Sequence, residues 1–189
     1  MSFILTVYMR DRILMAANET LVVKRLIDRI LLACRLRSSR RNTFLLFDQF
    51  GVSVCGQTTI DGEPVSRYVQ SLLRRQEWVR EPQVGDIAGM IFAHFSEMEP
   101  IPDLVFHVAG YNDAARHAEQ QVWFIDLAQG LIKRLNTEGA PGIAWDSSFA
   151  VLTREAVSIR KLTGILVITP HKAGWMDRSS IPRRLGLTG

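Results

Sequence analysis

The sequence has little of what usually assigns a function directly. Its 189 residues include two cysteines, Cys34 and Cys55, and both lie in apolar segments. Without Cys-x-x-Cys spacing or a secretion signal, they are expected to be reduced core thiols. The four histidines are scattered without metal-ligand spacing, and no glycine-rich phosphate loop is present. We therefore expect no metal and no cofactor, and we expect His107, in an apolar strand, to be a packed core histidine.

Long apolar runs are also missing. The longest, such as residues 30–34, are far shorter than the roughly 20 residues that a bilayer-spanning helix needs. The charged residues 10–12 interrupt the first apolar run too early for a signal peptide. These absences predict a cytoplasmic protein without a membrane partner.

The chain also lacks a strong net charge of either sign. The net charge of +4 is mild, and its main concentration is the arginine-rich run at residues 35–42. No aromatic residues alternate with these arginines, which favours a solvated helix end or a subunit contact over phosphate binding. A nucleic-acid partner is therefore not expected, and a basic binding module remains a remote alternative.

What is present is the composition of one packed domain. Apolar residues make up 47% of the chain and charged residues 22%, as is typical of globular proteins. The length suits a single domain with its own core. We predict that domain over residues 1–169, followed by a basic, poorly ordered tail over residues 170–189.

The order of the apolar patterns predicts an α+β fold. Residues 3–9 and 13–17 alternate around a charged turn, which predicts an N-terminal hairpin. Residues 20–37 carry apolar side chains near helical spacing with cations between them, which predicts an amphipathic helix or a helical insertion. Further strands are predicted at 43–47, 51–55, 104–110, 121–128, 131–135, near 143 and at 164–169, and helices at 65–75, 84–98 and 148–158. Strands joined by short turns favour antiparallel sheets, with the helices layered on them.

The beginning of the chain offers a candidate chemistry. Removal of Met1 would leave Ser2 as the N-terminus, with a hydroxyl that can attack and an α-amine that can take its proton. An α-amine has a pKa near about 7.7–8.0, so part of it is neutral at cellular pH. Many chains begin Met-Ser without consequence, so this start has weight only together with the pattern that follows it.

Three stretches resemble the proteasome family of N-terminal-nucleophile hydrolases, which includes the bacterial proteasome-like peptidases. Residues 2–18 have the nucleophile, strand, charged turn and strand ending in Ala-Ala and a small polar residue. Residues 44–56 are similar to the strand, turn, strand and glycine that precede an aspartate, here Asp61, and a long helix. Residues 105–111, 122–126 and 142–144 resemble the strand with Ala-Gly-Tyr, the strand with aspartate and the small-residue loop.

The resemblance implies a four-layer αββα sandwich of two antiparallel sheets flanked by helices. It also implies peptide-bond hydrolysis, a peptide or unfolded-protein substrate, and assembly into an oligomeric ring. By the same resemblance Ser2 takes the nucleophile position, where threonine is usual. Gly56 matches a glycine whose backbone N–H helps to hold the oxyanion, a donor commonly worth about 10²–10³ in rate. A turn that needs an unusual backbone angle is an equally good explanation of Gly56.

The chain departs from the family pattern around this nucleophile. Asn18 replaces an aspartate and so lacks its charge, and the expected lysine is absent, with Arg41 or Asn42 at the matching position. Arg41 supplies charge but does not titrate, and Lys24 is a distant substitute that requires residues 20–37 to pack over the site. Ser147 is the best candidate in the loop that usually reads Gly-Ser-Gly. A catalytically degenerate structural or assembly member of the same fold is therefore the alternative hypothesis.

Overall fold

The structure is a computed structural model of residues 1–189. It describes residues 3–17, 20–27, 30–37, 42–46, 49–75, 82–112, 119–137, 141–147, 165–169 and 172–176. Every structural statement below concerns these residues.

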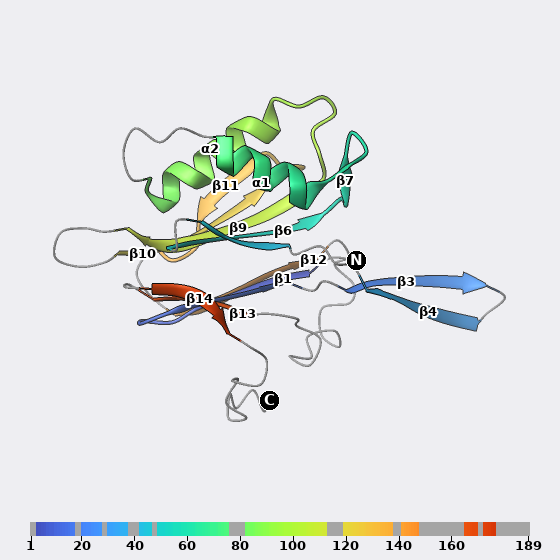
Figure 1. The fold of residues 1–189 in the computed structure, drawn as a ribbon, viewed down its shortest axis with the longest axis horizontal. Coiled ribbons are helices and arrows are strands. Elements are labelled where there is room, and N and C mark those ends of the chain that lie inside the picture. Colours follow the sequence, from blue (N-terminus) through green and yellow to red (C-terminus); the bar gives the residue numbers. More distant parts are fainter. Residues whose placement is uncertain are drawn as a thin grey trace.

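Two five-stranded antiparallel sheets pack face to face (Figure 1). The first sheet has the order β12 (Gly142–Ser147), β1 (Phe3–Tyr8), β2 (Ile13–Ala17), β13 (Ile165–Thr169) and β14 (Lys172–Met176). The second sheet has the order β11 (Leu131–Arg134), β10 (Glu119–Asp126), β9 (Leu104–Asn112), β6 (Phe50–Gly56) and β5 (Thr43–Leu46). The predicted α+β class with antiparallel sheets is confirmed, and so is the N-terminal hairpin.

Two helices, α1 (Val65–Arg75) and α2 (Val84–Ser96), cover the outer face of the second sheet (Figure 1). A short ladder of β7 (Thr59–Ile60) and β8 (Glu63–Pro64) leads into α1. At the start of α2 the backbone N–H of Gln83 donates to the Asp86 carboxylate at 3.0 Å, a reciprocal cap that fixes the first turn. Both helices were predicted from their apolar faces. Within the described residues helices cover one sheet only, and neither of them is long and apolar enough to cross a bilayer.

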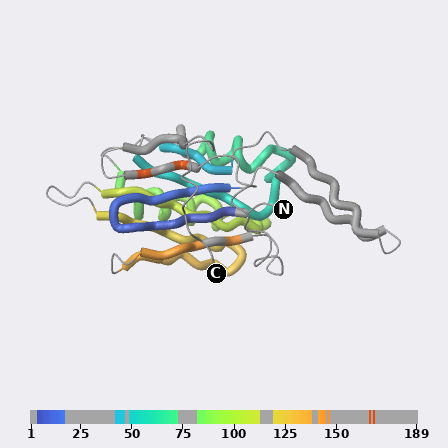
Figure 2. The backbone as a smooth tube through the Cα atoms, turned by 90° about the horizontal axis from the view of Figure 1, so that it is seen from below, coloured from blue at the N-terminus to red at the C-terminus, as the bar shows by residue number. Residues whose placement is uncertain are grey.

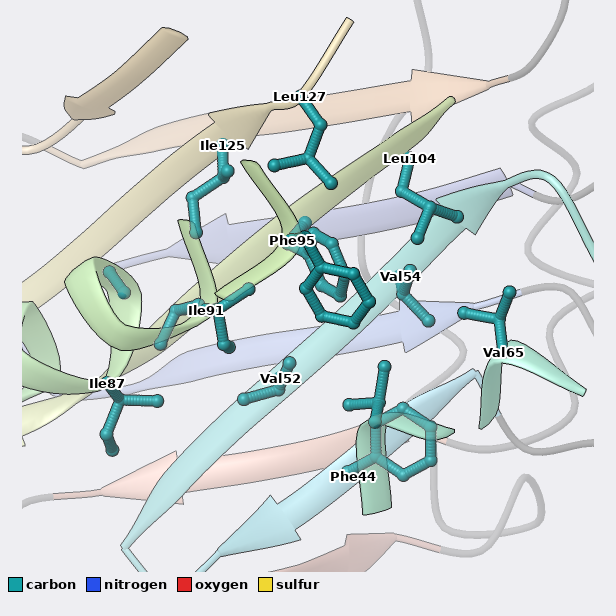
Figure 3. Close-up of a cluster of buried hydrophobic side chains, with 14 of the residues drawn as sticks. Phe44, Val52, Val54, Val65, Ile87, Ile91, Phe95, Leu104, Ile125 and Leu127 are labelled. Atoms are coloured by element: carbon teal, nitrogen blue, oxygen red, sulfur yellow. The ribbon is translucent and has the colours of Figure 1, made fainter. Parts of the chain in front are cut away.

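The larger core lies between these helices and the second sheet (Figure 3). Phe95 of α2 is fully buried, and its ring lies 5.3 Å from that of Phe106 of β9, centroid to centroid. Strand residues at alternate positions, such as Val52 and Val54, supply the sheet side of this core. The central strands β6 and β9 are buried at nearly every position, which explains why both of their faces carry mainly apolar or small residues.

The second core lies between the two sheets and depends on small residues. Met15 of β2 packs with Leu166 and Ile168 of β13 against the second sheet. A Cβ added at Gly51 would come within 2.9 Å of the side-chain carbons of both Leu166 and Ile168. Gly51 is opposite Ala109 in the β6–β9 pair, so two small residues together let the sheets approach closely.

The prediction of a helix at residues 20–37 is wrong. These residues form a β-hairpin of β3 (Thr20–Ile27) and β4 (Ile30–Arg37), in which Ile27 is opposite Ile30 (Figure 1). Dense apolar residues satisfy helical and strand periods alike, whereas the β-branched content and the two-residue connection favour a hairpin. This ribbon is a sheet of its own and pairs with no other described strand.

Part of the predicted unordered tail, residues 172–176, is a strand in the structure, and the rest of the tail lies outside the described residues. Lys172–Met176 is β14, an antiparallel partner of β13 at the edge of the first sheet. The strand is short and contains Gly174, so its sequence carries only a weak strand pattern. Its backbone hydrogen bonds come from pairing with β13. The predicted helix at 148–158 lies outside the described residues, whereas the short strand expected near residue 143 is confirmed as β12.

Candidate functional site

Two of the five predicted site residues belong to described strands. Gly56 ends β6, and Ser147 ends β12, where its backbone is described. Ser2, Asn18 and Arg41 lie outside the described residues. The site is therefore built from the strand ends that adjoin them, and its geometry follows from strand register.

Three strand ends meet at one end of the first sheet. Phe3 is opposite Ser147 across β1 and β12, and Ile4 is opposite Ala17 across β1 and β2. Cα atoms of opposed antiparallel residues are about 4.5–5.5 Å apart, and consecutive Cα atoms are about 3.8 Å apart. The end of β12 therefore lies beside the start of β1, and the roles predicted for Ser2 and Ser147 stay predictions.

The second sheet contributes to the same end of the molecule. Ile4, Ala17 and Cys55 form one buried cluster between the sheets, with Val105 of β9 packed against it. All three are at most 5% exposed. Cys55 immediately precedes Gly56, so the end of β6 lies beside the start of β1. In Figure 2 the turn of the β1–β2 hairpin lies at the opposite end of the sandwich from the N-terminus.

Gly56 has a conformation that requires glycine. Its φ is +119°, and a Cβ there would clash with the backbone carbonyl oxygen of Asp103. The adjoining turn is closed by Gln57, whose N–H donates to that same carbonyl at 2.9 Å and whose side-chain oxygen accepts from the Asp103 N–H at 3.1 Å. The turn explanation of Gly56 is therefore confirmed, and its role toward an oxyanion stays a prediction.

The described charged groups that act on Cys55 at this end are carboxylates. Burial is the main cause that raises the pKa of the Cys55 thiol, and the carboxylates of Asp146, Asp103 and Asp126 raise it further. Cys55 is therefore a protonated core thiol and not a nucleophile, as the sequence predicted. The described ends of β1, β2, β6 and β12 carry no lysine or arginine.

Lys24 does not gain support as the missing cation. Its predicted role required residues 20–37 to pack as a helix over the site. Lys24 instead occupies β3, opposite Ala33, in the hairpin that pairs with neither sheet of the sandwich among the described strands. The helix that the hypothesis required is therefore absent, and a role for Lys24 at the site stays a prediction.

A buried polar pair, Thr6 and His107, joins β1 to the second sheet, and the sequence predicted only His107. The Thr6 hydroxyl lies 2.9 Å from Nδ1 of His107, and both residues are 0% exposed. Burial lowers the pKa of His107 to about 4, so the ring is neutral at physiological pH. His107 is confirmed as a core histidine. The sequence did not predict a buried role for Thr6, because threonine occurs on either face of a strand. Its position two residues after Ile4 was the available signal, since residues two apart in a strand lie on the same face.

The same polar layer continues across the second sheet. Ser53 of β6 is opposite His107 on one side and Thr43 of β5 on the other. The Thr43 and Ser53 hydroxyls are 3.0 Å apart and buried. Since these hydroxyls are paired within the second sheet and buried, they are closed to a substrate.

No group of three or more metal-ligating side chains occurs within the described ranges. Comparison with known proteins adds no assignment, since no protein-family model matches the chain and no curated protein matches it significantly.

Proposed function

We propose that this protein is a proteasome-like N-terminal-nucleophile peptidase. The supporting observation is the meeting of strand ends around the start of β1. Register brings the end of β12 beside β1, and the cluster of Ile4, Ala17 and Cys55 brings the end of β6 there. A nucleophile at residue 2 would thus stand among backbone and side-chain donors supplied by both sheets.

The proposed reaction uses Ser2 as both nucleophile and base after Met1 is removed. Its hydroxyl oxygen attacks the peptide carbonyl carbon while the α-amine accepts the hydroxyl proton. That proton then passes to the departing amine as the C–N bond breaks, which leaves an ester on Ser2. Water hydrolyses the ester, with the α-amine again acting as the base. Overall one water is consumed for each peptide bond cleaved.

The neighbouring residues would stabilise this sequence. The N–H of Gly56 would donate to the developing oxyanion, and Ser147 and Asn18 would hydrogen-bond around the N-terminus. Arg41 would supply a fixed positive charge that does not titrate. The proposal extends to the remaining family properties, namely a second helix layer that completes an αββα sandwich, an oligomeric ring, a peptide or unfolded-protein substrate, and a cytoplasmic location without membrane or nucleic-acid partners.

The decisive test begins with the intact mass of the purified protein. Loss of Met1, followed by labelling of Ser2 with an electrophilic peptide probe, is the expected result. Ser2→Ala should lose peptide turnover and labelling, whereas Ser2→Thr, the matched control, should retain both. Retention of Met1, or turnover that survives in Ser2→Ala, would refute the mechanism.

A catalytically degenerate structural or assembly subunit is the second candidate function. It is favoured by the composition of the described strand ends there, which include Asp146 and no lysine or arginine. Native mass spectrometry discriminates the two hypotheses. A ring that assembles equally well from wild type and Ser2→Ala, with no turnover by either, would support the structural role.

A further inference from the structure

The β3–β4 hairpin is a long ribbon whose two strands contact each other and have no comparable contact with any other described element. Its strands have eight residues each, and at about 3.3 Å per residue the ribbon is about 26 Å long. Figure 1 shows it extending away from the two sheets. A two-stranded hairpin alone is at best marginally stable in water, so a further surface is needed to cover it.

Composition and register define what this ribbon can contact. Its sixteen strand residues include four cations and no acidic residue. Opposed residues of an antiparallel pair share a face, and alternate residues return to it. The register therefore gives a basic face, which holds three of the four cations with aliphatic residues between them: Lys24, Arg35, Arg37, Val22, Leu26 and Leu31. The opposite, apolar face carries Arg25 as its one charged residue.

The sandwich has a surface of complementary character between α2 and β9. In this acidic segment, residues 97–103, the side chains of Glu97, Glu99 and Asp103 are exposed and no cation occurs. Ile101, which lies among them, is 51% exposed and is one of two exposed large hydrophobic residues in the described part of the chain. The acidic segment thus combines negative charge with apolar surface, as the ribbon combines positive charge with apolar surface.

The ribbon and the acidic segment belong to the same end of the molecule. β3 begins three residues after Ala17, which packs with Cys55 at the end of β6. The N–H of Gln57, just beyond β6, donates to the carbonyl of Asp103 at 2.9 Å. A ribbon that extends from this end of one copy can therefore reach the same end of a second copy placed opposite it. A two-fold contact of this kind is isologous, so each ribbon reaches the other copy's acidic segment.

We propose that the β3–β4 hairpin is an arm that two copies of this chain exchange, with the basic face of each arm on the acidic segment of the other copy. Lys24 and Arg35 would pair with Glu97 and Glu99, and the aliphatic residues between these cations would cover Ile101. Reciprocal exchange places the two arms side by side, so that their apolar faces cover each other. This inference rests on the assembly part of the proposed function and is independent of the chemistry at Ser2.

Charge and composition favour a second copy over a nucleic acid as the occupant. The arm contains no aromatic residue on which a base could stack. Phosphates would also leave its apolar face uncovered, whereas a second arm covers that face.

The test is a charge swap between two variants of the full chain, followed by native mass spectrometry and light scattering over a micromolar concentration range. The arm variant carries Lys24→Glu and Arg35→Glu, and the segment variant carries Glu97→Lys and Glu99→Lys. Wild type should form a dimer, or an assembly of dimers, that weakens as salt is added, because exposed charges are screened. Each variant alone should raise the dissociation constant at least about tenfold, since each brings like charges together. A mixture of the two variants should restore the affinity, because in a mixed pair every arm meets a segment of opposite charge.

The matched control is Arg10→Glu with Lys133→Glu, because both cations are exposed and neither belongs to the arm or to the acidic segment. This control should assemble as wild type does. A monomeric wild type, an equal loss in the control, or a loss that the mixture does not restore would overturn the exchange. An oligomer that persists in both variants would also overturn it, while leaving assembly through another surface and the peptidase proposal intact.

The wild type gives a second readout that decides if either variant fails to fold. Cys34 is opposite Val23, near the middle of the arm and on its apolar face. Packed sheets lie about 10 Å apart, so a bismaleimide of that length should join two chains through Cys34. Cys34→Ser should abolish the product, since Cys55 is buried. An assembled wild type without this cross-link would refute the exchange of arms.

Discussion

His107 should make the stability of this protein depend on pH in a way that one substitution can isolate. The ring is fully buried between the sheets, and burial lowers its pKa to about 4 from an ordinary value of 6.5. In the unfolded chain the ring would recover the ordinary pKa. Acidification therefore adds a proton to the unfolded state before it adds one to the folded state, which favours unfolding.

The magnitude follows from that difference in pKa. One pKa unit corresponds to about 1.36 kcal/mol, so the neutral buried ring should cost the fold about 3 kcal/mol by pH 4. The stability should be complete above about pH 6.5 and should be lost progressively as the pH falls from 6.5 toward 4. The hydrogen bond between Thr6 and Nδ1 does not prevent this loss, because no partner for Nε2 is seen among the described residues.

The assay is urea unfolding of wild type and His107→Asn at several pH values between 7.5 and 4. Asparagine can retain the contact with Thr6 but does not titrate. His107→Asn should be less stable at pH 7.5, because the smaller side chain leaves space in the core. Wild type should lose about 3 kcal/mol more than the variant on going to pH 4, since all other titrating groups are common to both. Parallel curves of free energy against pH would refute the reasoning.

Three further predictions concern a glycine turn, a buried thiol and the helix–sheet core. Gly56→Ala should cost about 3 kcal/mol, because its φ of +119° and the Asp103 carbonyl both exclude a Cβ, whereas Gly130→Ala, at φ +60° with open space around it, should cost about 1 kcal/mol in urea unfolding. Cys55 should resist alkylation in the native protein and react in urea, measured by mass in a Cys34→Ser background, because the thiol is buried and its pKa is raised. Phe95→Ala should cost about 3–5 kcal/mol in urea unfolding and Phe95→Leu clearly less, since Phe95 fills the helix–sheet core.

Each of these predictions has a specific contradicting result. Equal costs for Gly56→Ala and Gly130→Ala would show that the site turn tolerates a side chain. Rapid native alkylation of Cys55 would place that thiol outside the intersheet cluster. A loss below about 1 kcal/mol for Phe95→Ala would mean that Phe95 is not central to the helix–sheet core.

Local pattern was sufficient for much of the architecture. The alternation at residues 3–9 and 13–17 around a charged turn predicted the β1–β2 hairpin, which the structure confirms. The apolar faces of α1 and α2 likewise predicted both helices. These features depend on periods of two and 3.6 residues, which neighbouring side chains specify without distant contacts.

Residues 20–37 show where local pattern was insufficient. The segment is so rich in apolar residues that helical and strand periods both fit, and backbone pairing between its halves decides for the hairpin. β14 was missed for a related reason, because its hydrogen bonds come from β13, and a short strand with a glycine carries little signal of its own. In both segments the deciding energy comes from a paired strand.

The sequence by itself determined the α+β class, the antiparallel hairpins, the core histidine and a candidate nucleophile at Ser2. Only the tertiary structure decided which strand ends meet at the start of β1. Strand register placed Ser147 and Asp146 beside β1, and the cluster containing Cys55 placed Gly56 at the same end. The physical reason is that the spacing at which side chains return to one face of a strand or helix is set by local backbone geometry. Which residues lie opposite one another across a sheet or between sheets depends on register and packing, and these bring together residues more than a hundred positions apart.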